Sequence, residues 1–125
     1  VEHYDPNFQE IALSILISII ESIGRLKFHI LGKEDRFVKA VYCYFDSKYT
    51  SDIKFMKAIR NLYQKDRSSL THEGKQLSLD TQITFQISLF AQDQNGKYYL
   101  GPISLFYIAL DIVKKYFEEI SYKQE

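Results

Sequence analysis

Residues 11–20 form a run of ten that is apolar apart from two serines, and a glutamate stands at each end of it. A helix needs about 20 apolar residues to cross a bilayer, so this run is too short for a membrane span. Apolar side chains on all sides instead predict a helix buried in the core of a folded domain. Asp5 and Pro6 precede the run and suit a helix start, because Asp accepts backbone N–H groups and Pro is tolerated in the first turn.

Apolar residues recur at intervals of three and four elsewhere, which predicts further helices. Gly32 is placed to end the first helix, and Gly24 could divide it. Thr50, Ser51 and Asp52 offer caps for the third helix, and an early acid here suits the helix dipole. The last helix carries apolar residues around most of its circumference, so we expect it to be buried on two sides. The expected helices cover residues 6–31, 34–45, 52–67 and 102–120.

The apolar period changes to two over residues 83–89, which is the spacing of a strand. Asn95-Gly96 is a turn signal, and residues 97–100 can supply the second strand. The predicted fold is therefore mainly α: an up-and-down helical bundle with a β-hairpin inserted before the last helix. The first, third and last helices are expected to form its core. Residues 1–125 fit a single domain, which could be excised from a longer protein.

The composition excludes a disordered chain, since 46% of residues are hydrophobic and only five are Gly and two Pro. Sixteen basic residues balance sixteen acidic ones, which argues against a protein that coats nucleic acid through bulk charge. Residues 33–75 nevertheless hold ten Lys and Arg against six Asp and Glu. This basic excess surrounds the third helix, where the candidate nucleic-acid-binding residues are Lys54, Lys57, Arg60 and Lys65.

Arg67 and His72 lie five positions apart at the end of this basic helix. Arg presents a planar, permanently charged fork that fits phosphate oxygens, and His exchanges its proton near neutral pH. Together they could cleave a phosphodiester without a metal, with His moving the proton and Arg stabilising charge. The alternative is structural: Arg67 pairs with a carboxylate and His72 lies near the last carbonyls of the helix.

Other reaction classes have little support. The five glycines are too scattered for a nucleotide-binding loop, and one cysteine with three separated histidines does not form a zinc site, so we expect no cofactor and no metal. Cys43 cannot form an internal disulfide, which fits a reducing, cytoplasmic location. Its apolar neighbours predict that Cys43 is a core residue.

The segment Leu62-Tyr63, Arg67-Ser68, His72 and Gly74 resembles the signature of the HEPN superfamily (higher eukaryotes and prokaryotes nucleotide-binding), and in particular its Apea-like branch. The resemblance implies a helical bundle that forms a homodimer and brings two Arg-Ser-x-x-x-His segments together. Active members are metal-independent RNases, often toxins or antiviral-defence proteins, that use the RNA 2′-hydroxyl as the attacking group. It implies that His72 is the general acid/base, that Arg67 stabilises the transition state and that Ser68 helps to position them. The hairpin would be an insertion in this pattern.

Three functions therefore remain open. The first is an RNA endonuclease of the HEPN type with a composite site at a homodimer interface. The second is a catalytically silent HEPN-like module that dimerises or binds RNA or nucleotide, with an antitoxin or a fused domain as a partner. The third is a helical interaction domain in which Arg67 and His72 only close a helix.

Overall fold

A computed structural model describes residues 6–29, 32–71 and 90–124. Five helices and a two-stranded antiparallel hairpin make up this part of the chain, and the hairpin precedes the last helix, as predicted. None of the described helices combines the length and the apolar content of a membrane span. In chain order the elements are α1 (Pro6–Phe28), α2 (Lys33–Tyr44), α3 (Ser47–Thr50), α4 (Ile53–Thr71), β1 (Ala91–Gln92), β2 (Tyr98–Tyr99) and α6 (Pro102–Gln124).

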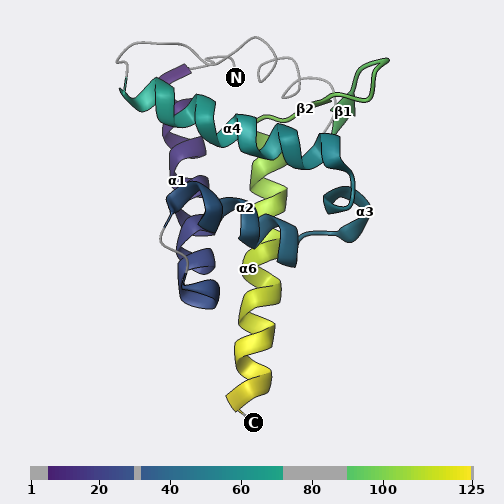
Figure 1. Cartoon of the computed structure of the whole chain (residues 1–125). Helices are drawn as coiled ribbons and strands as arrows, with labels where there is room; N and C mark the ends of the chain where they lie inside the picture. The colour runs from purple at the N-terminus through teal and green to yellow at the C-terminus, as the bar shows by residue number, and fades with distance from the viewer. Residues whose placement is uncertain (1–5, 30–31, 72–89, 125) are drawn as a thin grey trace.

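The arrangement of the helices differs from the expected up-and-down bundle. Figure 1 shows α1 and α6 running in the same direction, with α2 and α4 lying across them. The helix α4 crosses the end of the bundle at which α1 begins. Because α6 also starts from that end, α6 runs in the same direction as α1. The prediction of a mainly helical fold is confirmed. The prediction that successive helices alternate in direction, as in an up-and-down bundle, is wrong.

The core draws on α2 as much as on the three helices expected to form it. Phe37, Ala40, Val41 and Tyr44 of α2 share one helical face and are buried. They pack with buried residues of α1, α4, β2 and α6, among them Leu13, Ile20, Phe55, Ile59, Tyr98, Ile108 and Ile112.

Gly24 explains how α1 and α2 approach so closely. The helix α1 continues through Gly24 instead of dividing there, and a Cβ at this position would lie 2.2 Å from the backbone oxygen of Arg36 in α2. The helix ends at Phe28, before the expected residue 31, because His29 adopts a left-handed backbone (φ 55°).

A polar contact joins α1, α2 and α6 at their far ends. Lys27 Nζ donates to both carboxylate oxygens of Glu119 at 2.9 Å, and Tyr44 Oη donates to Glu119 Oε1 at 2.6 Å. Burial, together with the hydrogen bond to Glu119, raises the pKa of Tyr44 above its usual range. The phenol therefore stays protonated and keeps its donor role.

The last helix is buried on one side and not on two. Leu105, Ile108, Ala109 and Ile112 are buried, whereas Ile103, Phe106, Leu110 and Phe117 are exposed. The expectation of two buried sides is therefore wrong within this chain, because α1 and α2 cover only one side of α6.

We expect Gly24→Ala to destabilise the protein. In a helix interior this change normally stabilises by about 1 kcal/mol, but here the new Cβ meets backbone that cannot move aside. Overpacking costs about 1–3 kcal/mol, so the midpoint of urea unfolding should fall.

The matched control is Gly32→Ala, whose Cβ would lie 3.2 Å from the end of the flexible Asp35 side chain. Its midpoint should stay close to that of the wild type. A Gly24→Ala variant as stable as the wild type would contradict the close packing of α1 on α2.

Candidate nucleic-acid interface

The helix α4 is amphipathic, and its polar side is basic. Of the three cap candidates, Asp52 caps its start, because Asp52 Oδ1 accepts the backbone N–H of Lys54 at 2.9 Å. Phe55 and Ile59 point into the core and are fully buried. Lys57 lies on the opposite, exposed side, and so do Lys54 and Lys65. The core packing of α4 thus decides which side of the helix presents cations.

The hairpin is shaped by a tight turn around Asp93. Its Oδ1 accepts the backbone N–H groups of Asn95 at 2.8 Å and Lys97 at 3.0 Å, and its Oδ2 accepts the Tyr99 hydroxyl at 3.0 Å. The hydrogen bond from Lys97 is the main cause that lowers the pKa of Asp93 below its usual value. Gly96 takes a left-handed conformation (φ 83°), as the Asn-Gly turn signal predicted. Residues 83–89, the expected first strand, lie outside the described residues; in the described part β1 is Ala91–Gln92.

Aromatic packing holds the hairpin against the start of α4. The Tyr98 ring meets Phe55 edge-to-face with centroids 5.2 Å apart, and Phe90 lies 4.7 Å from Tyr49. Tyr98 Oη also donates to Asp52 Oδ2 at 3.3 Å, and Lys54 Nζ donates to the backbone oxygen of Asn95. The hairpin and α4 therefore form two walls whose separation is set by buried contacts.

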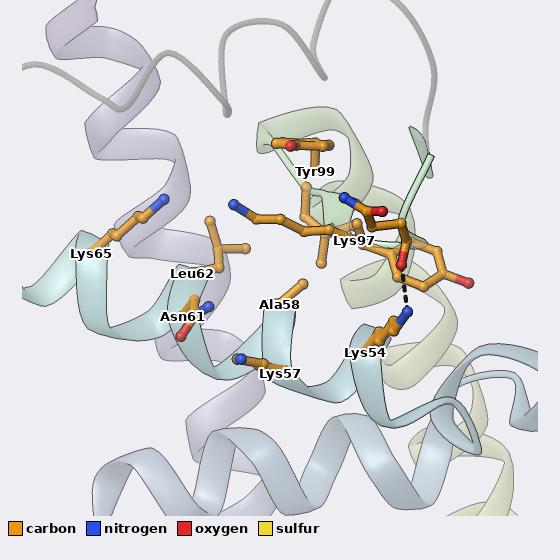
Figure 2. Close-up of a pocket in the computed structure, with 11 residues that line it drawn as sticks. Lys54, Lys57, Ala58, Asn61, Leu62, Lys65, Lys97 and Tyr99 are labelled. Carbon is orange, nitrogen blue, oxygen red and sulfur yellow. Dashed lines mark hydrogen bonds between the residues drawn. The ribbon is translucent and has the colours of Figure 1, made fainter. Parts of the chain in front are cut away.

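Between these walls lies a cavity of about 500 Å³. Figure 2 shows Lys97 reaching from the hairpin across the cavity towards the side of Lys65, with Tyr99 above it and Leu62 and Ala58 below. Lys54 and Lys57 complete a lining of four lysines, and no acidic residue lines the cavity in the described part of the chain.

This lining suits an anion with an attached planar group. Four ammonium groups create a local positive potential that attracts phosphate. Tyr99 is half-buried, and the Lys97 ammonium lies 5.1 Å from the centroid of its ring. Volumes of 300–1,000 Å³ are usual for sites that hold one small ligand. A nucleotide unit therefore matches the cavity in size and in charge.

The predicted basic residues divide into two groups. Lys54, Lys57 and Lys65 line the cavity. Arg60 lies on another side of α4, where its guanidinium pairs with Glu34 of α2 and lies 3.8 Å from Asp35. The structure thus places Arg60 in a contact between helices.

Arg67 and Ser68 lie in the last turns of α4, where the structure describes the backbone, and His72 lies outside the described residues. The helical period places position 68 in line with Asn61 and Lys65 of the cavity, seven and three residues earlier. Position 67 lies in line with Arg60, seven residues earlier, and not with the cavity residues.

Sequence reasoning missed the hairpin's contribution, namely Asn95, Lys97 and Tyr99. The turn was recognised, but its signal is local and does not indicate that the hairpin folds back on α4. The expectation for Cys43 was wrong: it is exposed, on the side of α2 away from the core. Among the described residues, no group of three or more His, Cys, Asp or Glu side chains could hold a metal ion.

No family model, curated protein or solved structure matches this chain.

We expect Asp93→Ala to loosen the hairpin wall, because two backbone N–H groups lose their acceptor. Amide hydrogen exchange of Lys97, followed by NMR, should be faster than in the wild type at neutral pH. The folded-state pKa of Asp93 is lowered, so its stabilising effect is present above the usual Asp pKa of about 3.9 and is lost as pH falls below it. The difference between variant and wild type should shrink accordingly on acidification.

Asp111→Ala serves as the control, since Asp111 pairs with Lys115 on α6, away from the turn. It should leave exchange at Lys97 unchanged. Equal exchange rates in Asp93→Ala and the wild type would show that the carboxylate does not hold the turn.

Proposed function

We propose that this chain is a HEPN-like domain that binds single-stranded RNA through the cavity between α4 and the hairpin. The observation that carries the proposal is the lining of four lysines with no acidic residue in the described part of the chain. The Leu62-Tyr63 and Arg67-Ser68 segment of the HEPN signature continues along the same helix.

The preference for a single strand follows from size and chemistry. The cavity has room for a nucleotide unit and not for a duplex, whose bases are stacked inside a helix. Lysine ammonium groups contact phosphates without reading the sequence, and a tyrosine ring offers a stacking surface to an unpaired base. Tyr99 is the ring best placed for that role.

The second candidate is a metal-independent RNA endonuclease, favoured by the position of Ser68 in line with the cavity residues Asn61 and Lys65. In this proposal the cavity holds the strand next to the cleavage site. Position 67 lies in line with Arg60 and not with the cavity, so Arg67 acts on a phosphate of the strand beyond the cavity, at the end of α4, where it stabilises the developing charge. His72 takes the proton of the 2′-hydroxyl as its oxygen attacks the adjacent phosphorus; the bond to the 5′-oxygen breaks, and that oxygen receives the proton. A homodimer would contribute a second copy of these residues.

The double variant Lys57→Glu, Lys65→Glu tests RNA binding. Reversing two charges should weaken binding of a short single-stranded RNA by at least about tenfold. It should also reduce the slope of log Kd against log salt by about 0.7 for each phosphate contact that is lost. Fluorescence anisotropy across a salt series measures both quantities.

Lys39→Glu is the control, since Lys39 is exposed on α2 and its substitution makes the charge change of one of the two reversals away from the cavity. It should keep the wild-type salt slope. Equal weakening by Lys39→Glu, or wild-type binding by the double variant, would count against the cavity as the binding site.

The endonuclease candidate predicts that His72→Ala abolishes cleavage of single-stranded RNA in the presence of EDTA, because the proton acceptor is lost. RNA binding and the thermal midpoint should remain near their wild-type values. Cleavage is followed by denaturing gel electrophoresis of a labelled RNA. Wild-type protein that binds RNA and leaves it intact would establish the silent binding module, and cleavage by His72→Ala would exclude His72 as the catalytic base.

A further inference from the structure

The side of α4 that faces the cavity carries one uncharged amide among its lysines. Asn61 lies about one helical turn after Lys57 and one turn before Lys65, and all three residues line the cavity. Asn61 is exposed, and its side-chain amide makes no hydrogen bond to other residues in the described part of the chain. Its NH₂ group and its oxygen are therefore open to a ligand that lies between the two lysines.

The second side-chain amide of α4 has different surroundings. Gln64 Nε2 donates to both carboxylate oxygens of Glu34 at 3.3 Å, on the side of α4 that α2 covers. Gln64 therefore belongs to a contact between helices and does not line the cavity. The comparison singles out Asn61 as the amide of α4 that a ligand in the cavity can reach.

The opposite wall of the cavity supplies a ring on which a base can stack. Asp93 Oδ2 accepts the Tyr99 hydroxyl at 3.0 Å, which fixes the orientation of the ring. The Lys97 ammonium lies 5.1 Å from the ring centroid on an exposed, flexible side chain. A base can take its place on the ring and leave the ammonium free to contact a phosphate. Figure 2 shows Tyr99 on one side of the cavity and Asn61 and Leu62 on the other, so a base stacked on Tyr99 lies in the space that Asn61 lines.

The chemistry of an amide favours one base. An amide pairs with a base edge on which a donor lies beside an acceptor. Adenine presents its N6–H beside N7 on one edge and beside N1 on the other, so it can pair with an amide in two orientations. Cytosine and uracil offer such a pair on the Watson–Crick edge alone, and guanine presents two acceptors, O6 and N7, on its other edge. Adenine also has the larger ring system of a purine to stack on tyrosine.

We propose that Asn61 reads the base of the bound strand and makes the cavity prefer adenine. This proposal rests on the proposed RNA binding and adds the base that the cavity selects. The amide oxygen of Asn61 accepts N6–H, and its NH₂ group donates to N7 or N1. Tyr99 stacks on the base, and Lys57 and Lys65 contact the flanking phosphates.

Binding of three RNA octamers, followed by fluorescence anisotropy, tests the proposal. One octamer is made of adenosine, one of uridine and one of purine riboside, which is adenosine without its 6-amino group. Purine riboside keeps the stacking surface of adenosine and loses the N6–H donor. The wild type should bind the adenosine octamer at least about fivefold more tightly than either of the others, because only adenine makes the bidentate contact in both orientations and on a purine-sized ring.

Asn61→Ala and Asn61→Asp should each lose this preference, since alanine removes the amide and aspartate removes its NH₂ donor. The added charge of aspartate acts on all three octamers, so the ratio of their affinities is the quantity to compare. Because Asn61 is exposed, far-UV circular dichroism should report folded variants. Gln64→Ala is the matched control: it removes the other amide of α4 and should keep the wild-type preference.

Equal binding of the adenosine and purine riboside octamers by the wild type would overturn the proposal, because stacking alone would then explain the affinity. A preference for adenosine that folded Asn61→Ala retains would overturn it as well. Either result leaves RNA binding by the cavity standing. A wild type that binds none of the octamers would overturn the proposed function, and this proposal with it.

Discussion

The aromatic cluster at the start of α4 decides where the candidate site is. Phe55 lies at its centre, with Tyr98 of β2 packed edge-on against it and Phe45 stacked at 5.9 Å. This packing attaches a hairpin of only two residues per strand, which would be marginal on its own, to a long helix. The cavity exists because the cluster holds the two walls at a fixed separation. Without it, Lys97 and the α4 lysines would not face a common space.

Much of the helical architecture could be predicted because its signals are local. The cap of α4 is Asp52, one of the three residues expected to offer it, and the spacing of Phe37 and Val41 marks the buried side of α2. The course of the chain could not be predicted in the same way. Gly24 looked like a helix breaker, although its lack of a side chain permits the contact with α2 instead. That role depends on the partner helix, which no local pattern identifies.

The candidate site was predictable on one wall only. Helical spacing placed Lys54 and Lys57 away from the core residues of α4, the basic excess around this helix pointed to Lys65 as well, and all three line the cavity. Arg60 has the same charge and nearly the same spacing, yet it meets Glu34, because α2 covers that side of α4. Tertiary packing thus gives Arg60 and the α4 lysines different neighbours, although they lie on one helix. Lys97 of the hairpin could not be predicted for the same reason. It lines the cavity only because the tertiary fold brings the hairpin next to α4, which is distant in the sequence.

The neutral net charge of the chain is consistent with a basic cavity, because the charges are unevenly distributed along the chain. Residues 33–75 carry the basic excess, whereas the segments before and after them carry an acidic one. Attraction between exposed charges is largely screened beyond about 10 Å at ordinary ionic strength. A phosphate at the cavity therefore responds to the nearby lysines more than to the distant acids, while the molecule as a whole avoids self-repulsion.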